Sequence, residues 1–272
     1  MLERYGDDAK LLAGGQSLIA GLNMRLASPR VLIDLNRIAG LEGITVAGGT
    51  ARIGALTRHR TVEHSREIAR HLPLLKQALP HVAHTAIRNR GTFGGSIAFA
   101  DPAAELPACS IALDAIFVLA GKRGERRVRA REFFKGLYET DLKPGEVLIA
   151  GEIPVLKAGC CSAFGELTRR SGDYAIVGLA AHGKLERGVF TDLALAFFGV
   201  GATPVLAHQA AAAMIGKDVS AAPIAAAQAR LDRDLTPFDD IYHKAATKMH
   251  LARVLLGRVL NQLVSGDGHA GN

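Results

Sequence analysis

The chain has 272 residues, of which 49% are hydrophobic and 22% are charged, and its formal net charge is +7. This balance is typical of a globular protein with an apolar core, and it excludes a disordered or collagen-like chain. No apolar run reaches the roughly 18 residues of a membrane span, and we expect no signal peptide because the N-terminal segment lacks a basic head and an apolar stretch. The three cysteines, two of them adjacent, build no disulfide framework, so we expect a reducing, cytoplasmic setting.

The first half of the chain predicts short helices mixed with short strands. The pair Gly48-Gly49 predicts a hairpin, because glycine accepts the positive φ angles of a two-residue turn. The polar, glycine-rich segment 88–96 predicts a loop. The expected elements are a helix at 18–26, a buried strand at 31–35, the hairpin 44–54, helices at 61–68 and 73–79, a helix from 107, a hairpin at 116–129 and a strand at 146–153.

From about residue 157 the pattern changes. Long strand-like stretches with tight turns between them predict an antiparallel meander, and an alanine-rich, helical region follows it. We expect the last helix to be capped by Asp239 or Asp240, to include Ile241 and to end at Gly266. The expected strands lie at 158–168, 175–185 and 193–200, and the expected helices before the last one at 205–215 and 224–231. These patterns predict an α+β protein of two domains, residues 1–154 and 158–266.

The densest basic stretch lies between Lys122 and Arg131, in the second predicted hairpin. The plainest interpretation is a hairpin with a solvated basic tip. A docking surface for an acidic partner or an anionic cofactor stays open. Nucleic-acid binding is disfavoured because no aromatic side chain interleaves with this stretch.

Two glycine-rich segments are candidates for binding phosphate. Ala-Gly-Gly-Gln-Ser at 13–17 lies between a strand and a helix, and Thr-Phe-Gly-Gly-Ser occupies 92–96. Glycine pairs let several N–H groups converge and allow a phosphate to approach the backbone closely. Taken alone, each segment is more typical of a tight turn, and neither is a Rossmann or Walker fingerprint. Together, two such loops suit the pyrophosphate of a dinucleotide. The preceding Arg88 and Arg90 either face phosphate or support the loop through ion pairs.

Four motifs follow one another along the chain: A-G-G-Q-S at 13–17, R-N-R-G-T-F-G-G-S at 88–96, D-P-A-A-E-L-P at 101–107 and R-R-S-G-D-Y-A-I-V-G at 169–178. In this order they resemble the FAD-binding medium subunit of molybdenum hydroxylases, the group of the carbon monoxide dehydrogenase flavoprotein and the flavin domain of xanthine dehydrogenase. The resemblance covers almost the whole chain. It implies a two-part FAD-binding domain, split near residue 34, followed by a C-terminal domain with a three-stranded antiparallel sheet and helices.

The resemblance also assigns roles to individual residues. It implies that the first glycine segment wraps the FAD pyrophosphate through backbone amides and that the second supplies the other side of the clamp. Glu105 stands where the family has an aspartate that contacts the adenosine part, Ile149 packs by the isoalloxazine ring, and Tyr174 lies against that ring. The implied cofactor contacts are Ala13, Gly14, Gly15, Gln16, Ser17, Leu18, Thr92, Gly94, Gly95, Ser96, Glu105, Ile149 and Tyr174.

The function implied by the resemblance is that of an FAD-carrying electron-transfer subunit. A small partner subunit with two [2Fe–2S] clusters delivers electrons, a large partner subunit holds the molybdenum cofactor, and the assembly is a dimer of heterotrimers. Two alternatives stay open: a stand-alone FAD-dependent oxidoreductase, and a basic, non-enzymatic scaffold. We expect no catalytic acid or base in this chain, and we expect that NAD is not the electron acceptor, because Tyr174 fills the space of a nicotinamide ring.

We expect no metal site. Five histidines crowd residues 59–84, but only His81 and His84 have a helical spacing, and no carboxylate stands beside them. Three unpatterned cysteines also exclude an iron–sulfur cluster in this subunit. Family members carry a strand and most of a helix before the first glycine segment, so we expect either an earlier start or a first sheet that lacks a strand.

Overall fold

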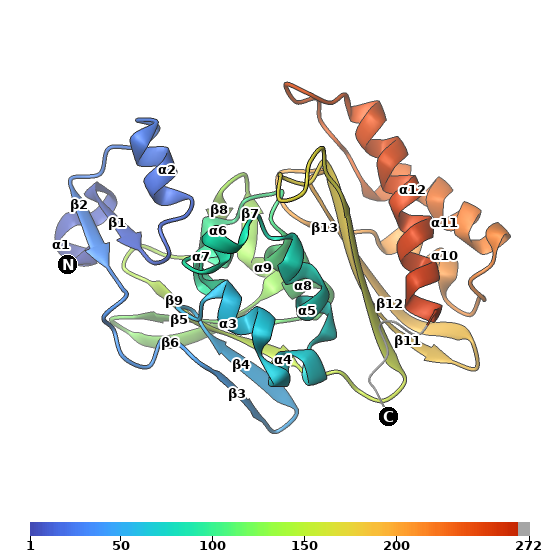
Figure 1. Cartoon of the computed structure of the whole chain (residues 1–272), viewed down its shortest axis with the longest axis horizontal. Helices are drawn as coiled ribbons and strands as arrows, with labels where there is room; N and C mark the ends of the chain where they lie inside the picture. The colour runs from blue at the N-terminus through green and yellow to red at the C-terminus, as the bar shows by residue number, and fades with distance from the viewer. Residues whose placement is uncertain (266–272) are drawn as a thin grey trace.

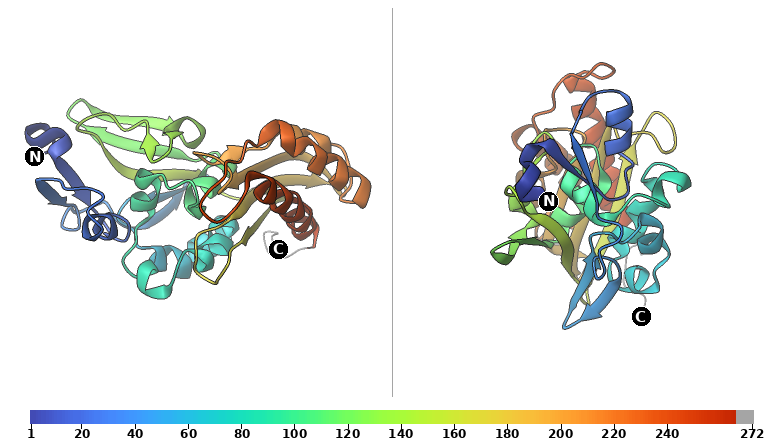
Figure 2. Two further views of the ribbon diagram at one scale, coloured as in Figure 1. Left: turned by 90° about the horizontal axis from the view of Figure 1, so that it is seen from above. Right: turned by 90° about the vertical axis from the view of Figure 1, so that its left-hand side faces the viewer.

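The computed structural model describes residues 1–265 (Figure 1). The molecule is elongated and has three parts: an N-terminal lobe (residues 1–34), a central lobe (44–154) and a C-terminal lobe (160–265). The N-terminal and C-terminal lobes lie at opposite ends of the long axis (Figure 2). The predicted mixture of helices and strands, the α+β class, is confirmed.

The N-terminal lobe is built on two parallel strands. β1 (Ala9–Leu12) and β2 (Val31–Asp34) pair in register, and the first glycine segment follows β1 directly. The prediction of a buried strand was wrong, since the residues of β2 are half-buried or exposed in alternation. The helices of this lobe are α1 (Leu2–Tyr5), η1 (Gly6–Asp8) and α2 (Leu18–Asn23), the last one shorter than predicted.

The central lobe contains a five-stranded antiparallel sheet with the order β3-β4-β9-β5-β6. Both predicted hairpins are confirmed, and Gly48 and Gly49 have φ angles of 57° and 77°. β9 comes last in the chain but lies in the middle of the sheet, so the sheet holds together segments about 100 residues apart. The strands are β3 (Ile44–Ala47), β4 (Thr50–Gly54), β5 (Ile116–Gly121), β6 (Gly124–Arg129) and β9 (Val147–Pro154).

Short helices connect these strands, and two predictions about them were wrong. The predicted helix at 61–68 is two helices, because the Ser65 hydroxyl accepts a hydrogen bond from the N–H of Ile68 and starts a new helix. The predicted loop at 88–96 includes the start of a helix, which Thr92 caps. The elements are α3 (His59–His64), α4 (Arg66–His71), α5 (Pro73–Ala78), η2 (Leu79–His81), α6 (Thr85–Arg88), α7 (Phe93–Phe99), α8 (Glu105–Ala112), α9 (Ala130–Phe133), β7 (Phe134–Gly136) and β8 (Glu139–Thr140).

The C-terminal lobe contains the predicted antiparallel meander, extended by a two-residue fourth strand. The prediction of one helix at 205–215 was therefore wrong, because its first residues form that strand. Ile241 precedes the last helix and is 92% exposed, while the Asp239 carboxylate accepts a hydrogen bond from the N–H of Ala245; Gly266 lies outside the described residues. The elements are β10 (Cys160–Leu167), β11 (Val177–Glu186), β12 (Val189–Phe198), β13 (Val205–Leu206), α10 (His208–Met214), α11 (Ala221–Asp234) and α12 (Ala245–Val264).

The meander is covered on both faces, which joins the central and C-terminal lobes. α5 and α8 pack on one face, and α10 and α12 pack on the other (Figure 1). Phe164 and Phe198 of the meander belong to the same apolar core as Leu74 and Leu106 of the central lobe. This shared core fixes the loop between β10 and β11, which contains Tyr174, relative to the start of α8.

Candidate functional site

The loop between β1 and α2 presents a row of unpaired backbone donors. Within the described residues, no hydrogen bond uses the N–H of any of the five residues from Gly14 to Leu18. Gly15 has a φ of 73°, a left-handed conformation that glycine adopts without steric cost. Successive N–H groups in such a turn form a concavity suited to an anion.

The second glycine segment is a helix start whose amides are already engaged. The N–H groups from Phe93 to Ser96 donate to the carbonyl oxygens of Thr57 and Ala55 and to the hydroxyl and carbonyl oxygens of Thr92, at 2.8–3.1 Å. These four N–H groups are therefore engaged, and among the backbone N–H groups of residues 92–96 only that of Thr92 has no partner within the described residues. The Ser96 side chain is half-buried, and its hydroxyl has no partner in the part of the chain that the structure describes.

The two segments come from different lobes and lie against each other. A Cβ atom built on Gly14 would lie 2.4 Å from the carbonyl oxygen of Arg90 and 2.8 Å from the Cα atom of Gly91. A Cβ atom built on Gly95 would lie 3.8 Å from the Cβ atom of Ala13. The structure thus brings residues 13–18 and 92–96 together, as one clamp requires.

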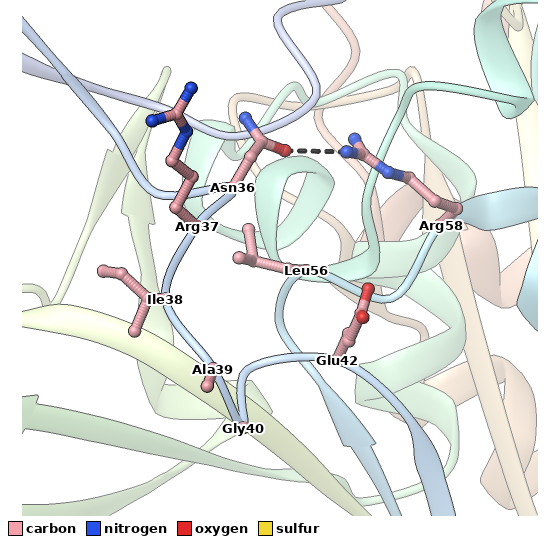
Figure 3. Close-up of a pocket in the computed structure, with 8 residues that line it drawn as sticks. All are labelled: Asn36, Arg37, Ile38, Ala39, Gly40, Glu42, Leu56 and Arg58. Carbon is pink, nitrogen blue, oxygen red and sulfur yellow. Dashed lines mark hydrogen bonds between the residues drawn. The ribbon is translucent and has the colours of Figure 1, made fainter.

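Two residues that the sequence did not single out bridge these segments. The Asn36 amide donates to the carbonyl oxygen of Ala13 at 2.9 Å, and its oxygen accepts a hydrogen bond of 2.7 Å from Arg58. Arg58 also donates to the carbonyl oxygen of Arg90. Figure 3 shows Asn36 and Arg58 pointing toward each other, with Arg37 turned away. No local pattern marks this bridge, since the partners that join the two segments are 22 or more positions apart.

The Arg88 side chain supports the second segment. Its Nε atom lies 2.8 Å from a carboxylate oxygen of Glu63, and one of its terminal nitrogens donates to the carbonyl oxygen of Val82 at 3.1 Å. The sequence left two roles open for Arg88, contact with phosphate or an ion pair that supports the loop, and the structure shows the ion pair. The buried His59 adds a second support, because its Nε2 atom lies 2.8 Å from the carbonyl oxygen of Thr92. Burial lowers the pKa of His59 to about 4, so at neutral pH this ring is uncharged.

The other predicted contacts surround the second segment. The carbonyl oxygen of Ile149, on β9, accepts a hydrogen bond from Ala55, whose own carbonyl accepts the N–H of Gly94. Glu105 starts α8, and burial, with smaller effects of Glu166 and Asp101, raises the pKa of its carboxyl to about 8.

Tyr174 lies on the loop between β10 and β11 and is 70% exposed. The loop is closed by the N–H of Ile176, which donates to the carbonyl oxygen of Leu167 at 2.8 Å, and the N–H of Tyr174 donates to the side chain of Asp173 at 3.0 Å. Asp101 and Glu105 lie close enough to act electrostatically on the Tyr174 phenol. The structure thus places the Tyr174 loop near the start of α8.

Comparisons with known proteins identify the family. The model described as FAD binding domain in molybdopterin dehydrogenase matches residues 1–156, and the model of the CO dehydrogenase flavoprotein C-terminal domain matches residues 162–263. The chain belongs to the FAD-binding medium subunits of the molybdenum hydroxylases. It is therefore an oxidoreductase subunit, and its cofactor is FAD.

Individual relatives agree with this family. The chain is 39% identical over 261 residues to the 6-hydroxypseudooxynicotine dehydrogenase complex subunit alpha of Paenarthrobacter nicotinovorans, over 96% of this chain and 88% of that one. It is 36% identical to the carbon monoxide dehydrogenase medium chain of Hydrogenophaga pseudoflava, over 96% and 91%. The solved carbon monoxide dehydrogenase of that organism superimposes with a TM-score of 0.94 at 38% identity, over 96% and 91%. The quinoline 2-oxidoreductase of Pseudomonas putida 86 gives 0.92 at 35%, over 98% and 93%.

The residues of the first glycine segment fit this cofactor. Five consecutive unpaired N–H groups are the donor set that a diphosphate requires, and the backbone contact at Gly14 leaves no room for a side chain. Within residues 1–265, no group of three or more His, Cys, Asp or Glu side chains is placed to hold a metal ion. No helix in that range combines the length and apolar character of a membrane span.

The basic stretch 122–131 is largely used within the fold. Arg126 binds the carboxylates of Glu146 and Asp141 at 2.7 Å, which raises its pKa. Arg127 pairs with Glu152 at 3.0 Å in the same way. Since these partners come from the chain itself, the central part of the stretch is neutralised and only its tip fits the predicted solvated hairpin.

Proposed function

We propose that residues 13–18 hold the pyrophosphate of FAD and that the chain passes electrons from the [2Fe–2S] clusters of a small partner subunit to an external acceptor. The observation that carries this proposal is the run of five N–H groups without a partner at residues 14–18, in a segment that lies against residues 90–95. When bound, FAD supplies the reversible redox chemistry. A large partner subunit would hold the molybdenum cofactor and oxidise the substrate.

The residues of this chain would bind the FAD and orient it. The N–H groups of Gly14 to Leu18 would donate to phosphate oxygens, and such charge-assisted hydrogen bonds are short and strong. The free hydroxyl of Ser96 would donate from the other side. Glu105 keeps its proton at neutral pH because its pKa is about 8, so it adds no negative charge near the diphosphate and can donate to a sugar hydroxyl of the adenosine part.

Tyr174 and Ile149 would contact the isoalloxazine ring. An exposed tyrosine ring on a fixed loop is suited to stacking, which contributes roughly 0.5–1.5 kcal/mol beyond burial. A ring in that position occupies the space that a nicotinamide needs for hydride transfer. We therefore propose that the acceptor is a quinone, a small carrier protein or oxygen rather than NAD.

We further propose the assembly and its setting. Support comes from the relatives, whose names describe a complex subunit and a medium chain. The proposal is a dimer of heterotrimers in the cytoplasm, with an FAD-binding domain at 1–154, split near residue 34, and a C-terminal domain at 158–266 whose last residue lies outside the described range. A native extract should give this chain in a particle well above 28.7 kDa that contains iron and molybdenum.

The test of function uses the purified native complex. Its bound flavin is reduced anaerobically, and NAD or a quinone is then added while the flavin spectrum is followed. We expect rapid reoxidation by the quinone and no formation of NADH; rapid NADH formation would contradict the proposal. Replacing Tyr174 by alanine should change the flavin spectrum, whereas Tyr174→Phe should retain it. Reduction of the isolated subunit by a small substrate would favour the stand-alone enzyme instead.

A further inference from the structure

The two halves of the proposed cofactor site belong to different lobes, and a chain of side-chain hydrogen bonds connects them. Asn36 donates to the carbonyl oxygen of Ala13 in the N-terminal lobe. Arg58 donates to the side-chain oxygen of Asn36 and, with its other terminal nitrogen, to the carbonyl oxygen of Arg90 in the central lobe. One guanidinium therefore links the first glycine segment to the residues that lead into the second (Figure 3).

Both ends of this connection are anchored locally. The Asp34 carboxylate, at the end of β2, accepts hydrogen bonds from the backbone N–H and the side-chain amide of Asn36 at 2.9 and 2.6 Å. These bonds lower the pKa of Asp34, so the anchor is ionised at neutral pH. Arg58 precedes α3 and follows Thr57, whose carbonyl oxygen accepts the N–H of Phe93. A change at either side chain thus acts on the spacing of the two glycine segments.

Part of the segment between the lobes packs loosely. Residues 36–40 are exposed, Gly40 has a φ angle of 80°, and a cavity of about 130 Å³ lies against them (Figure 3), whereas Leu41 and Gly43 are hydrogen-bonded to the central lobe. Such a connection allows the lobes to vary in separation unless other contacts hold them. The backbone contact of Gly14 with Arg90 limits how closely they approach, and the Arg58 bonds oppose their separation.

We propose that Arg58 and Asn36 are positioning residues that hold the two lobes at the separation at which the first glycine segment and the Thr92–Ser96 segment grip one pyrophosphate. This inference rests on the proposed function. Arginine suits the task because its planar fork presents several donors in a fixed geometry and reaches two acceptors at once, whereas lysine is a point charge without that fork. Without the clamp, FAD itself must bring the lobes together, and that ordering weakens its binding.

The rival explanation is simple charge, since any arginine near a diphosphate attracts it. Arg37 is the matched control, because it lies in the same interlobe segment and points away from Arg58 (Figure 3). If charge alone matters, Arg37→Met and Arg58→Met weaken FAD binding alike. If the clamp matters, only Arg58→Met does so.

The experiment measures the Kd of FAD for the apoprotein by quenching of flavin fluorescence, together with the thermal midpoint of each apoprotein. We expect Arg58→Met to raise the Kd about tenfold, as for the loss of charge-assisted hydrogen bonds. Arg58→Lys should recover part of this loss, and Arg37→Met should stay within about twofold of the wild type. The apoprotein midpoint should change little, because the two apolar cores of the described residues contain no residue of the N-terminal lobe, so the clamp does not contribute to them.

A double-variant cycle separates the clamp from two independent effects. Since Asn36 acts through Arg58, the double variant Asn36→Ala/Arg58→Met should bind FAD no more weakly than the poorer single variant. Additive losses would overturn the clamp, and so would an unchanged Kd in Arg58→Met or an equal loss in Arg37→Met. If Arg58→Met does not fold, Asn36→Ala carries the same test. Failure of the wild-type apoprotein to bind FAD would overturn the proposed function itself, a result distinct from all of these.

Discussion

Replacing Gly14 by alanine tests the clamp at its tightest point. Gly14 does not have a positive φ, so backbone strain is not the issue. The added Cβ atom would lie 2.4 Å from the carbonyl oxygen of Arg90, while an ordinary Cβ contact begins at 3.4 Å. Both neighbouring groups are backbone, so no flexible side chain can move aside. The two segments must therefore separate by about 1 Å.

A separation of this size is large for a hydrogen-bonded ligand. A charge-assisted N–H to phosphate bond of about 2.8 Å is lost when the distance grows by 1 Å. Each such bond contributes about 1.5–3 kcal/mol. If the pyrophosphate stays at the second segment and loses two of its bonds to the amides of the first, FAD binding weakens by about 3 kcal/mol, or roughly 100-fold in Kd.

The assay is titration of the apoprotein with FAD, with Gly21→Ala as the matched control. Gly21 lies inside α2, and a Cβ atom there meets no atom within 4 Å. This control should bind FAD like the wild type and gain about 0.5–1 kcal/mol of stability, as expected for glycine to alanine within a helix. If Gly14→Ala also binds FAD with the wild-type Kd, the idea of two abutting segments gripping one pyrophosphate is refuted.

Three further predictions concern the second segment and its surroundings. Gly95→Val should lose FAD and lower the thermal midpoint by a few degrees. The reason is that its Cβ atom would lie 2.6 Å from the Thr92 hydroxyl that caps α7, and a cap contributes about 1 kcal/mol. A midpoint and a flavin content like those of the wild type would contradict this prediction. His59 has a pKa of about 4 in the folded protein against 6.5 when unfolded, so stability should fall as pH drops from 6.5 to 4, and His59→Gln should flatten that slope in thermal melts. Glu105 has a pKa of about 8 in the folded protein against 4.5 when unfolded, so between these values the folded protein holds a proton that the unfolded chain releases. The stability of the apoprotein should therefore fall as pH rises from 4.5 to 8. If stability falls equally with pH in Glu105→Gln, another group is responsible.

The sequence predicts well those features that depend on residues close together in the chain. The turn at Gly48-Gly49, the antiparallel meander and the order of the family motifs all depend on neighbouring residues, and the structure and the family models agree with them. The start of α12 was predicted too early, because Ile241 continues the apolar spacing of the helix although it lies in the loop before it. Periodicity alone does not separate an apolar surface residue from a core residue.

The second glycine segment was misjudged for a physical reason. Its composition is that of a loop, yet Phe93 and Gly94 donate to the carbonyl oxygens of Thr57 and Ala55, which lie more than 30 residues earlier. The hydrogen bonds to these distant acceptors, together with the Thr92 cap, offset the conformational entropy that is lost when a glycine-rich helix start becomes ordered. The bridging residues Asn36 and Arg58 were missed for the same reason, since the partners through which they join the two segments are 22 or more positions away in sequence.

The two glycine segments therefore have different roles although their sequences look alike. In the first, glycine provides a left-handed turn at Gly15 and leaves five N–H groups without a partner. In the second, glycine allows the chain to pass so close to β4 that a Cβ atom on Gly94 would lie 2.4 Å from the side chain of Ala55, and its N–H groups are used to hold that contact. One segment offers donors and the other offers a fixed surface. Variants of the first should thus weaken FAD binding in a folded protein, whereas variants of the second should weaken binding and stability together.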